Sequence, residues 1–71
     1  MQIIRVNLTT EYIKLDQLLK FSGVTDTGGN AKFLVESGEC SVNGVKCLQR
    51  GKKIRVGDIV NVEDKEIHIV E

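Results

Sequence analysis

The sequence lacks proline and tryptophan, and its 71 residues include only three aromatic side chains, Tyr12, Phe21 and Phe33. It also lacks an apolar run near the roughly 18 residues of a membrane-spanning helix, and its first residues do not follow the basic-then-apolar order of a signal peptide. We therefore expect a cytoplasmic protein with no membrane segment. A chain this short predicts one domain, residues 1–71, with little room for an enclosed active site.

Metal ligands and catalytic groups are equally scarce. The soft metal donors are Cys40, Cys47 and His68, whereas a structural zinc site needs about four ligands. His68 has no acid or nucleophile close to it in sequence, and the chain contains no evident set of nucleophile, base and orienting residue. The sequence thus predicts no catalytic residue, no metal site, no cofactor and no small-molecule substrate.

The two cysteines flank a predicted β-hairpin. Asn43 and Gly44 form a strong two-residue turn signal, because both central residues of such a turn take positive φ, which Asn and Gly tolerate best. Pairing the residues on either side of this turn places Cys40 opposite Cys47. That spacing permits a disulfide, but a reducing cytosol favours free thiols, which is the interpretation we adopt.

Positive charge is concentrated locally, although the formal net charge is zero. Between Cys40 and Gly57 there are five cations and no acid, whereas Asp58 to Glu71 holds five acids and a single lysine. The five cations are Lys46, Arg50, Lys52, Lys53 and Arg55. This asymmetry creates a local field for which a polyanion is the natural partner. The alternative is a hairpin rim whose charges only face water.

Two short helices are predicted from apolar periodicity. The inward positions are Leu15, Leu18, Leu19 and Ser22 in the first helix, and Ala31, Leu34 and Val35 in the second. Gly23 and Gly38 are expected to end these helices, and Asp26 or Thr27 is expected to cap the start of the second.

The remainder of the chain reads as strands. An opening strand covers Ile3 to Leu8 with alternate apolar residues on one face, and the hairpin joins Cys40–Val42 to Val45–Leu48. Two further strands are expected at Ile59–Val62 and Ile67–Val70. One strand, two helices and about four strands predict an α+β fold in which the helices cover one face of a sheet.

A glycine pair opens the second predicted helix. Gly28 and Gly29 would each cost about 1 kcal/mol relative to alanine in a helix, so helix propensity does not explain them. Either the backbone needs unusual dihedral angles there, or a phosphate approaches the bare N–H groups closely, with Lys32 adding charge one turn later.

Several motifs occur in an order typical of a known family. These motifs are Lys14–Leu19, Ala31, Val42–Gly44 and Ile54–Val60. Their order resembles the S-four RNA-binding domain, also called the alpha-L motif, over residues 13–62, with flanking N- and C-terminal strands. Two sharper signatures, Asp26–Lys32 and Arg50–Asp58, look like those of the short stand-alone bacterial members, the YaaA type.

The resemblance implies two short helices packed on a small, mostly antiparallel β-sheet, and binding of structured RNA by the exposed side of the helices and the basic loop. With the glycine pair included, the expected RNA-binding residues are Lys14, Gly28, Gly29, Lys32, Arg50, Lys52, Lys53 and Arg55. The chain departs from the family in two places. Thr27-Gly28 replaces a common Ser-Arg pair, and Gln49 stands where the stand-alone type often has a second arginine.

Most of these residues also have ordinary structural explanations. Lys14 and Lys20 are typical helix-surface lysines, and Asp16 is expected to offset the helix dipole and pair with Lys20. Phe21 and Phe33 could stack on bases, but packing in the core is the more frequent use of phenylalanine.

The sequence as a whole favours a non-catalytic RNA-binding protein that recognises structured RNA, plausibly ribosomal RNA in ribosome assembly or translation. Phosphate contacts and RNA shape should dominate recognition, because the chain offers lysine and arginine but few aromatics. The alternative is a protein-interaction adaptor whose basic rim meets an acidic partner. The identity of the RNA, its base preference and the oligomeric state are left open by the sequence.

Overall fold

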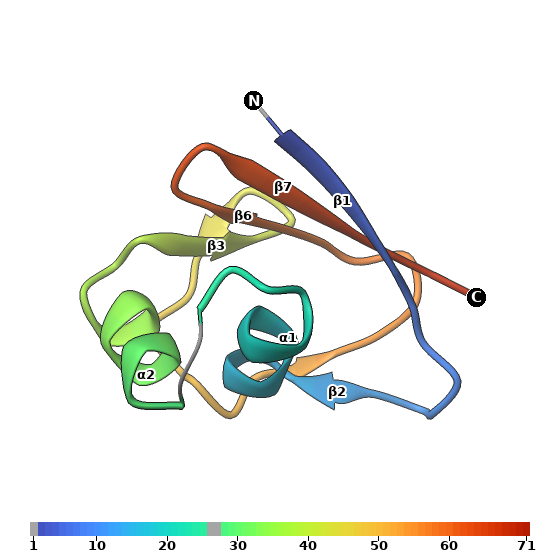
Figure 1. The fold of residues 1–71 in the computed structure, drawn as a ribbon, viewed down its shortest axis with the longest axis horizontal. Helices are drawn as coiled ribbons and strands as arrows, with labels where there is room; N and C mark the ends of the chain where they lie inside the picture. Colours follow the sequence, from blue (N-terminus) through green and yellow to red (C-terminus); the bar gives the residue numbers. More distant parts are fainter. Residues whose placement is uncertain (1, 26–27) are drawn as a thin grey trace.

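The computed structural model describes residues 2–25 and 28–71. Its elements, in chain order, are β1 Gln2–Asn7, β2 Ile13–Lys14, α1 Leu15–Phe21, α2 Gly28–Glu36, β3 Cys40–Val42, β4 Val45–Lys46, β5 Lys53–Ile54, β6 Ile59–Val62 and β7 Lys65–Val70. A five-stranded sheet has the order β1-β7-β6-β3-β4, and both helices lie on one of its faces (Figure 1). The predicted α+β class is confirmed.

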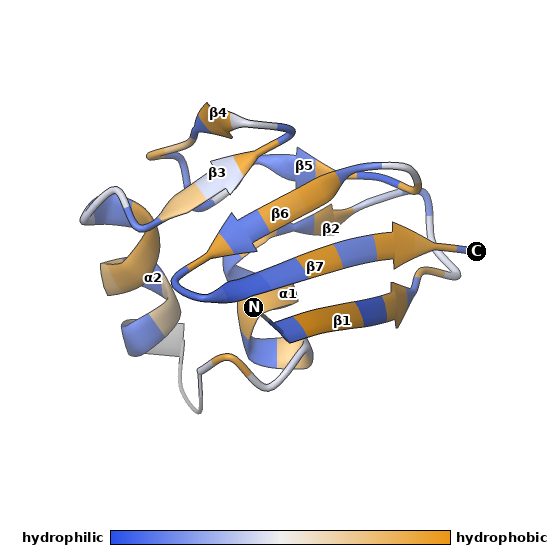
Figure 2. Cartoon of the chain, turned by 90° about the horizontal axis from the view of Figure 1, so that it is seen from above, coloured by the Kyte–Doolittle hydropathy of each residue, from blue (hydrophilic) through white to orange (hydrophobic). Residues whose placement is uncertain are grey.

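The sheet is antiparallel except at one edge. There β1 pairs parallel to β7, with Gln2 opposite Lys65 and Asn7 opposite Val70. Figure 2 shows the sheet from the side away from the helices, with β1 and β4 at its two edges. The expected inward face of the opening strand is confirmed, since Val6 is buried and Ile4 and Leu8 pack against the core.

The helices form where their apolar spacing predicts. Leu15, Leu18 and Leu19 of α1 are fully buried, as are Ala31 and Val35 of α2. Each helix is followed by the expected glycine. Two backbone hydrogen bonds from the glycine and the next residue satisfy carbonyls of the last turn. After α1, the Gly23 and Val24 amides donate to Lys20 and Leu19; after α2, the Gly38 and Glu39 amides donate to Val35 and Leu34. The proposed capping residues Asp26 and Thr27 lie outside the described residues.

Asp16 behaves differently from the sequence expectation. Its carboxylate accepts the Gln17 backbone N–H at 2.8 Å, and the described residues show no ion pair between Asp16 and Lys20. The predicted helical ion pair is therefore wrong. An acceptor for an amide of the first turn stabilises the start of the helix directly, without ordering a long lysine side chain in water.

The predicted hairpin is confirmed, with Val42 opposite Val45 and positive φ at both turn residues, 52° at Asn43 and 84° at Gly44. Strand β4 ends at Lys46, two residues earlier than expected, although the Cys47 amide still donates to the Cys40 carbonyl at 3.0 Å. Both thiols are free. The last turn is also tighter than expected, because β7 already begins at Lys65.

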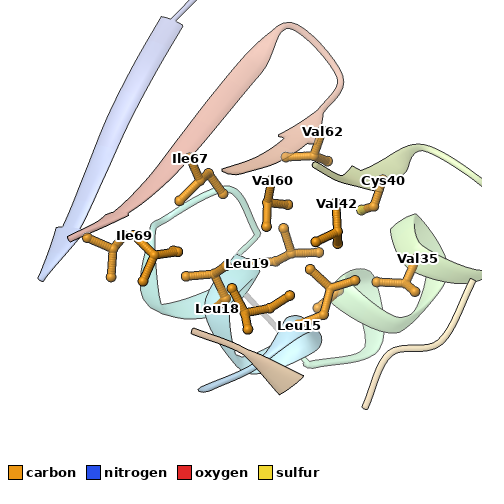
Figure 3. Packing of buried hydrophobic residues seen from close by; sticks show 13 residues of the cluster. Leu15, Leu18, Leu19, Val35, Cys40, Val42, Val60, Val62, Ile67 and Ile69 are labelled. Carbon is orange, nitrogen blue, oxygen red and sulfur yellow. The ribbon is translucent and has the colours of Figure 1, made fainter. Parts of the chain in front are cut away.

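The core fills the space between the sheet and the helices (Figure 3). Leucines of α1 meet valines and isoleucines of β3, β6 and β7, and Ile54 of β5 is also fully buried. Phe21 and Phe33 are not part of this core, with exposed fractions of 68% and 69%. The core interpretation of both phenylalanines is thus wrong, because smaller aliphatic side chains already occupy the inward stripe of each helix. None of the helices described here has the length and apolar character to cross a membrane.

Candidate nucleic-acid interface

The basic loop, residues 49–55 with the short strand β5 inside it, is fixed against the start of α1. The Leu15 amide donates to the Lys52 carbonyl at 2.9 Å, and the Asp16 amide donates to the Arg50 carbonyl at 3.0 Å. The loop itself contains a turn in which the Lys52 amide donates to the Gln49 carbonyl. Because the loop carbonyls occupy the first amides of α1, this helix start does not offer them to a phosphate.

A two-residue ladder, which the sequence did not indicate, brings two lysines together. Strand β2 pairs antiparallel with β5, so that Ile13 lies opposite Ile54 and Lys14 lies opposite Lys53. Directly opposed residues project to the same face with Cβ atoms about 4.5–5.5 Å apart. The buried Ile54 anchors this ladder to the core, while both lysines are exposed.

Among the described residues, the opposed lysines have no acidic partner. Within residues 2–25 and 28–71, side-chain ion pairs occur at Asp64–Lys65 and Glu66–His68, and neither involves the basic loop. The Lys53 ammonium instead lies over the Tyr12 ring, 5.0 Å from its centroid. A cation–π contact of this kind orients an ammonium without neutralising its charge. The site therefore keeps its positive field.

The other proposed residues fall into two places. Arg50, Lys52 and Arg55 are exposed on the loop side with the lysine ladder. Gly28, Gly29 and Lys32 belong to the first half of α2, and Lys32 is exposed. The hairpin reaches the opposite end of α2, where Lys46 carbons and Nζ lie 3.6–3.7 Å from the position of a Cβ on Gly38. At 1.5 Å per residue the two ends of α2 are about 13 Å apart, so the glycine pair lies at the end of α2 away from Lys46.

An open groove of about 850 Å³ separates the hairpin from the segment Lys52–Asp58. Its charged lining consists of four cations, Lys46, Lys52, Lys53 and Arg55, and one acid, Asp58, whereas its apolar surface includes Val45, Leu48 and Val56. No local pattern in the sequence predicts the groove, because Leu48 and Val56 are separated in the chain and each is an ordinary apolar residue of its own segment. Only the fold of the loop places them on facing segments.

Asn43 and Asp58 connect the two sides of this groove. The Asp58 carboxylate accepts the Arg55 backbone N–H at 2.8 Å and the Asn43 side-chain amide at 3.1 Å. The Asn43 side-chain oxygen in turn accepts the Ile59 N–H at 2.9 Å. The sequence identified both residues as turn formers but gave no sign that one turn is hydrogen-bonded to the other.

Comparison with known proteins assigns the chain to a family that agrees with its fold. A model of the S4 domain matches residues 6–70 of the chain. The chain belongs to the S4 domain family. It is also similar to the probable ribosome maturation protein RlbA of Bacillus subtilis (strain 168), with 40% identity over 58 residues that cover 82% of each protein. The family resemblance and the alpha-L architecture expected from the sequence are confirmed.

The single histidine of this S4 domain lies on the sheet face away from the helices. Its Nε2 is 2.5 Å from Oε1 of Glu66, and His68 faces Arg5 across the β1–β7 pair. The statement that no acid lies near His68 is therefore wrong, because residues i and i+2 of a strand share a face. The pair lies on β7, and neither residue lines the groove described above.

The Cys40 thiol of the S4 domain is free and lies in the buried core. Burial, with a smaller contribution from Cys47, raises the pKa of the Cys40 thiol to about 11. A buried neutral thiol behaves as a small apolar side chain. Within the residues described, no group of three histidine, cysteine or acidic side chains gathers to hold a metal ion.

Proposed function

We propose that this S4 domain is a non-catalytic protein that binds structured RNA, with ribosomal RNA during ribosome maturation or translation as its target. The binding surface comprises the opposed lysines of the β2–β5 ladder and the exposed cations of the basic loop. Membership of the S4 family supports the RNA-binding activity, and the name of the Bacillus relative, a probable ribosome maturation protein, supports the ribosomal context.

The observation that carries the proposal is the direct opposition of Lys14 and Lys53 without an acidic partner among the described residues. Two like unit charges repel each other even in water, by about 1 kcal/mol at a separation of about 4 Å and by less at longer range. Like charges directly across a ladder destabilise a sheet, so the fold gains nothing from this pair by itself. A phosphate placed between the two ammonium groups reverses the sign of the interaction.

The backbone of folded RNA fits this arrangement better than a particular base sequence does. Lysine and arginine supply phosphate contacts, which set register and orientation but carry no direct sequence information. The spacing of the cations along a loop and a ladder instead selects for the positions of phosphates in a folded RNA. The glycine pair and Lys32 form a second candidate contact at the start of α2.

The salt dependence of RNA binding tests the proposal. Five phosphate contacts, from Lys14, Arg50, Lys52, Lys53 and Arg55, give a log-log salt slope of about −3.5 to −4.5. This slope corresponds to a loss of affinity of roughly 130- to 500-fold between about 50 and 200 mM salt. Filter binding to transcripts of the bacterial large- and small-subunit ribosomal RNAs measures the slope.

Replacing Lys52 and Lys53 together by alanine should reduce the magnitude of the slope by about 1.5 to 2. The matched control removes Arg5 and Lys65, two cations of the β1–β7 edge, and should leave the slope unchanged. If the Lys52/Lys53 variant keeps the parent affinity and slope, the basic loop does not bind RNA. If a cellular pull-down retains its partner after RNase treatment, an acidic protein is the partner instead.

A further inference from the structure

The groove beside the basic loop contains more exposed apolar surface than phosphate binding requires. Val45, Leu48 and Val56 have exposed fractions of 70%, 56% and 43%, and all three line this groove. Phosphate contacts need only cations and hydrogen-bond donors. Apolar side chains that gather between cations therefore indicate a ligand with an apolar part as well as a negative charge.

The apolar side chains come from both sides of the groove. Val45 belongs to the edge strand β4 and Leu48 follows it, whereas Val56 lies in the turn after β5. A slot with apolar walls on two sides suits a flat apolar group that packs by its faces. Gln49 also lines the groove, and its side chain makes no hydrogen bond to the described residues. The side-chain amide can therefore form hydrogen bonds with the polar edge of such a group.

The two walls are held in place before any ligand binds. The Asn43–Asp58 hydrogen bond joins the hairpin turn to the turn that contains Val56, and the Asp58 carboxylate also fixes the Arg55 amide. A preformed slot avoids the entropy cost of ordering its walls around the ligand.

We propose that this groove takes an unpaired nucleobase of the bound RNA, while the surrounding cations hold the phosphates on either side of it. The inference rests on the proposed RNA-binding function and deepens it, because it specifies RNA with a bulged or looped nucleotide rather than a continuous duplex. A nucleotide combines a flat apolar base with an anion on each side, which matches the distribution of apolar walls and cationic rim. Unstacked bases are packed between apolar side chains in other nucleic-acid sites.

Three RNA hairpins of equal length test this proposal by fluorescence anisotropy at about 50 mM salt, where phosphate binding is strong. One is fully paired, one carries a three-nucleotide bulge, and one carries the same bulge with abasic residues; bulges of each of the four bases are measured. The bulged hairpin with bases should bind about tenfold more tightly than the abasic one, the lower range of what a packed base contributes. The abasic control keeps the charge and flexibility of the bulge and removes only the base.

Variants locate the effect within the protein. Leu48→Ser should bring the affinities for the bulged and abasic hairpins together, and Val56→Ser gives the same test from the other wall. Ile3→Ser is the matched control, because Ile3 is 59% exposed but lies on β1, at the opposite edge of the sheet from β4. It should keep the tenfold preference, and circular dichroism establishes that each variant is folded.

Equal affinity of the parent protein for bulged and abasic hairpins overturns the base-binding groove while leaving RNA binding by the basic loop intact. A preference that survives in both Leu48→Ser and Val56→Ser shows that the base binds elsewhere. Absence of binding to all three hairpins overturns the groove and the proposed function together. Tight binding of an acidic leucine-containing peptide, lost in Leu48→Ser, combined with no base preference, assigns the groove to a protein partner instead.

Discussion

Removal of the Asp58 carboxylate should destabilise the protein although the residue lies near the surface. In Asp58→Ala the Arg55 backbone N–H and the Asn43 side-chain amide both lose an acceptor, at 2.8 and 3.1 Å. Hydrogen bonds to a charged group contribute about 1.5–3 kcal/mol when they are protected from water, and about 1 kcal/mol is reasonable for each of these exposed bonds. We therefore expect the free energy of unfolding to fall by about 2 kcal/mol.

For a chain of 71 residues this loss corresponds to a melting temperature lower by about 8–16 °C. Urea titration followed by circular dichroism measures the change directly. The matched control is Glu36→Ala, which also removes one negative charge but from an exposed position on α2. Its unfolding free energy should stay within about 0.5 kcal/mol of the parent value.

A double-mutant cycle assigns the effect to the connection between the turns. Asn43→Gly removes the side-chain amide but tolerates the positive φ of 52° at this position. Combined with Asp58→Ala, it should show a coupling energy of about 0.5–1 kcal/mol, since the two side chains contact each other. An Asp58→Ala variant as stable as Glu36→Ala would refute the reasoning, because the two bonds would then be no better than those to water.

Two further predictions concern Cys40 and the glycine pair. Because burial raises the pKa of the Cys40 thiol to about 11, iodoacetamide at pH 8 should modify Cys47 first and Cys40 only after unfolding, as followed by mass spectrometry. In the folded protein Cys40 stays protonated above the usual thiol pKa of 9.0, so the stability that this neutral thiol contributes should be lost as the pH rises from about 9 to 11. A stable Cys40–Cys47 disulfide in freshly lysed cells would contradict the free-thiol interpretation. Gly29→Ala should raise the melting temperature, because alanine is favoured over glycine in a helix by about 1 kcal/mol, and should weaken RNA binding if a phosphate approaches the backbone there. Unchanged RNA affinity in the folded variant would favour a purely conformational role for the glycine pair.

The correct sequence predictions were those that depend on neighbouring residues. The spacing of Leu15, Leu18 and Leu19 defines an apolar stripe, and the glycine after each helix ends that helix. The prediction of the Asn43-Gly44 turn was also correct, because the positive φ angles of such a turn depend on the two residues that adopt them. The positive charge of residues 46–55 was likewise visible in the order of the residues.

The errors and omissions arose where separate segments meet. No local pattern indicates that Gln2 pairs with Lys65 in a parallel ladder, or that the two-residue strand at Lys14 pairs with Lys53. The residue type of Phe33 favours burial, but Ala31 and Val35 fill the inward face of its helix, so the phenyl ring stays exposed. Burial is decided by competition among all apolar side chains for a limited interior.

The sequence by itself thus determined the helices, the hairpin and the sign of the charge, because periodicity, turn dihedrals and charge are properties of adjacent residues. The tertiary structure decided which cations oppose each other, which apolar residues face the groove and which turn is hydrogen-bonded to which. Lys14 and Lys53 are far apart in the chain, as are Asn43 and Asp58, and each pair meets only because the buried core fixes the strands that carry them. Such pairings depend on the packing free energy of the whole domain. No single segment of the sequence contains enough information to predict them.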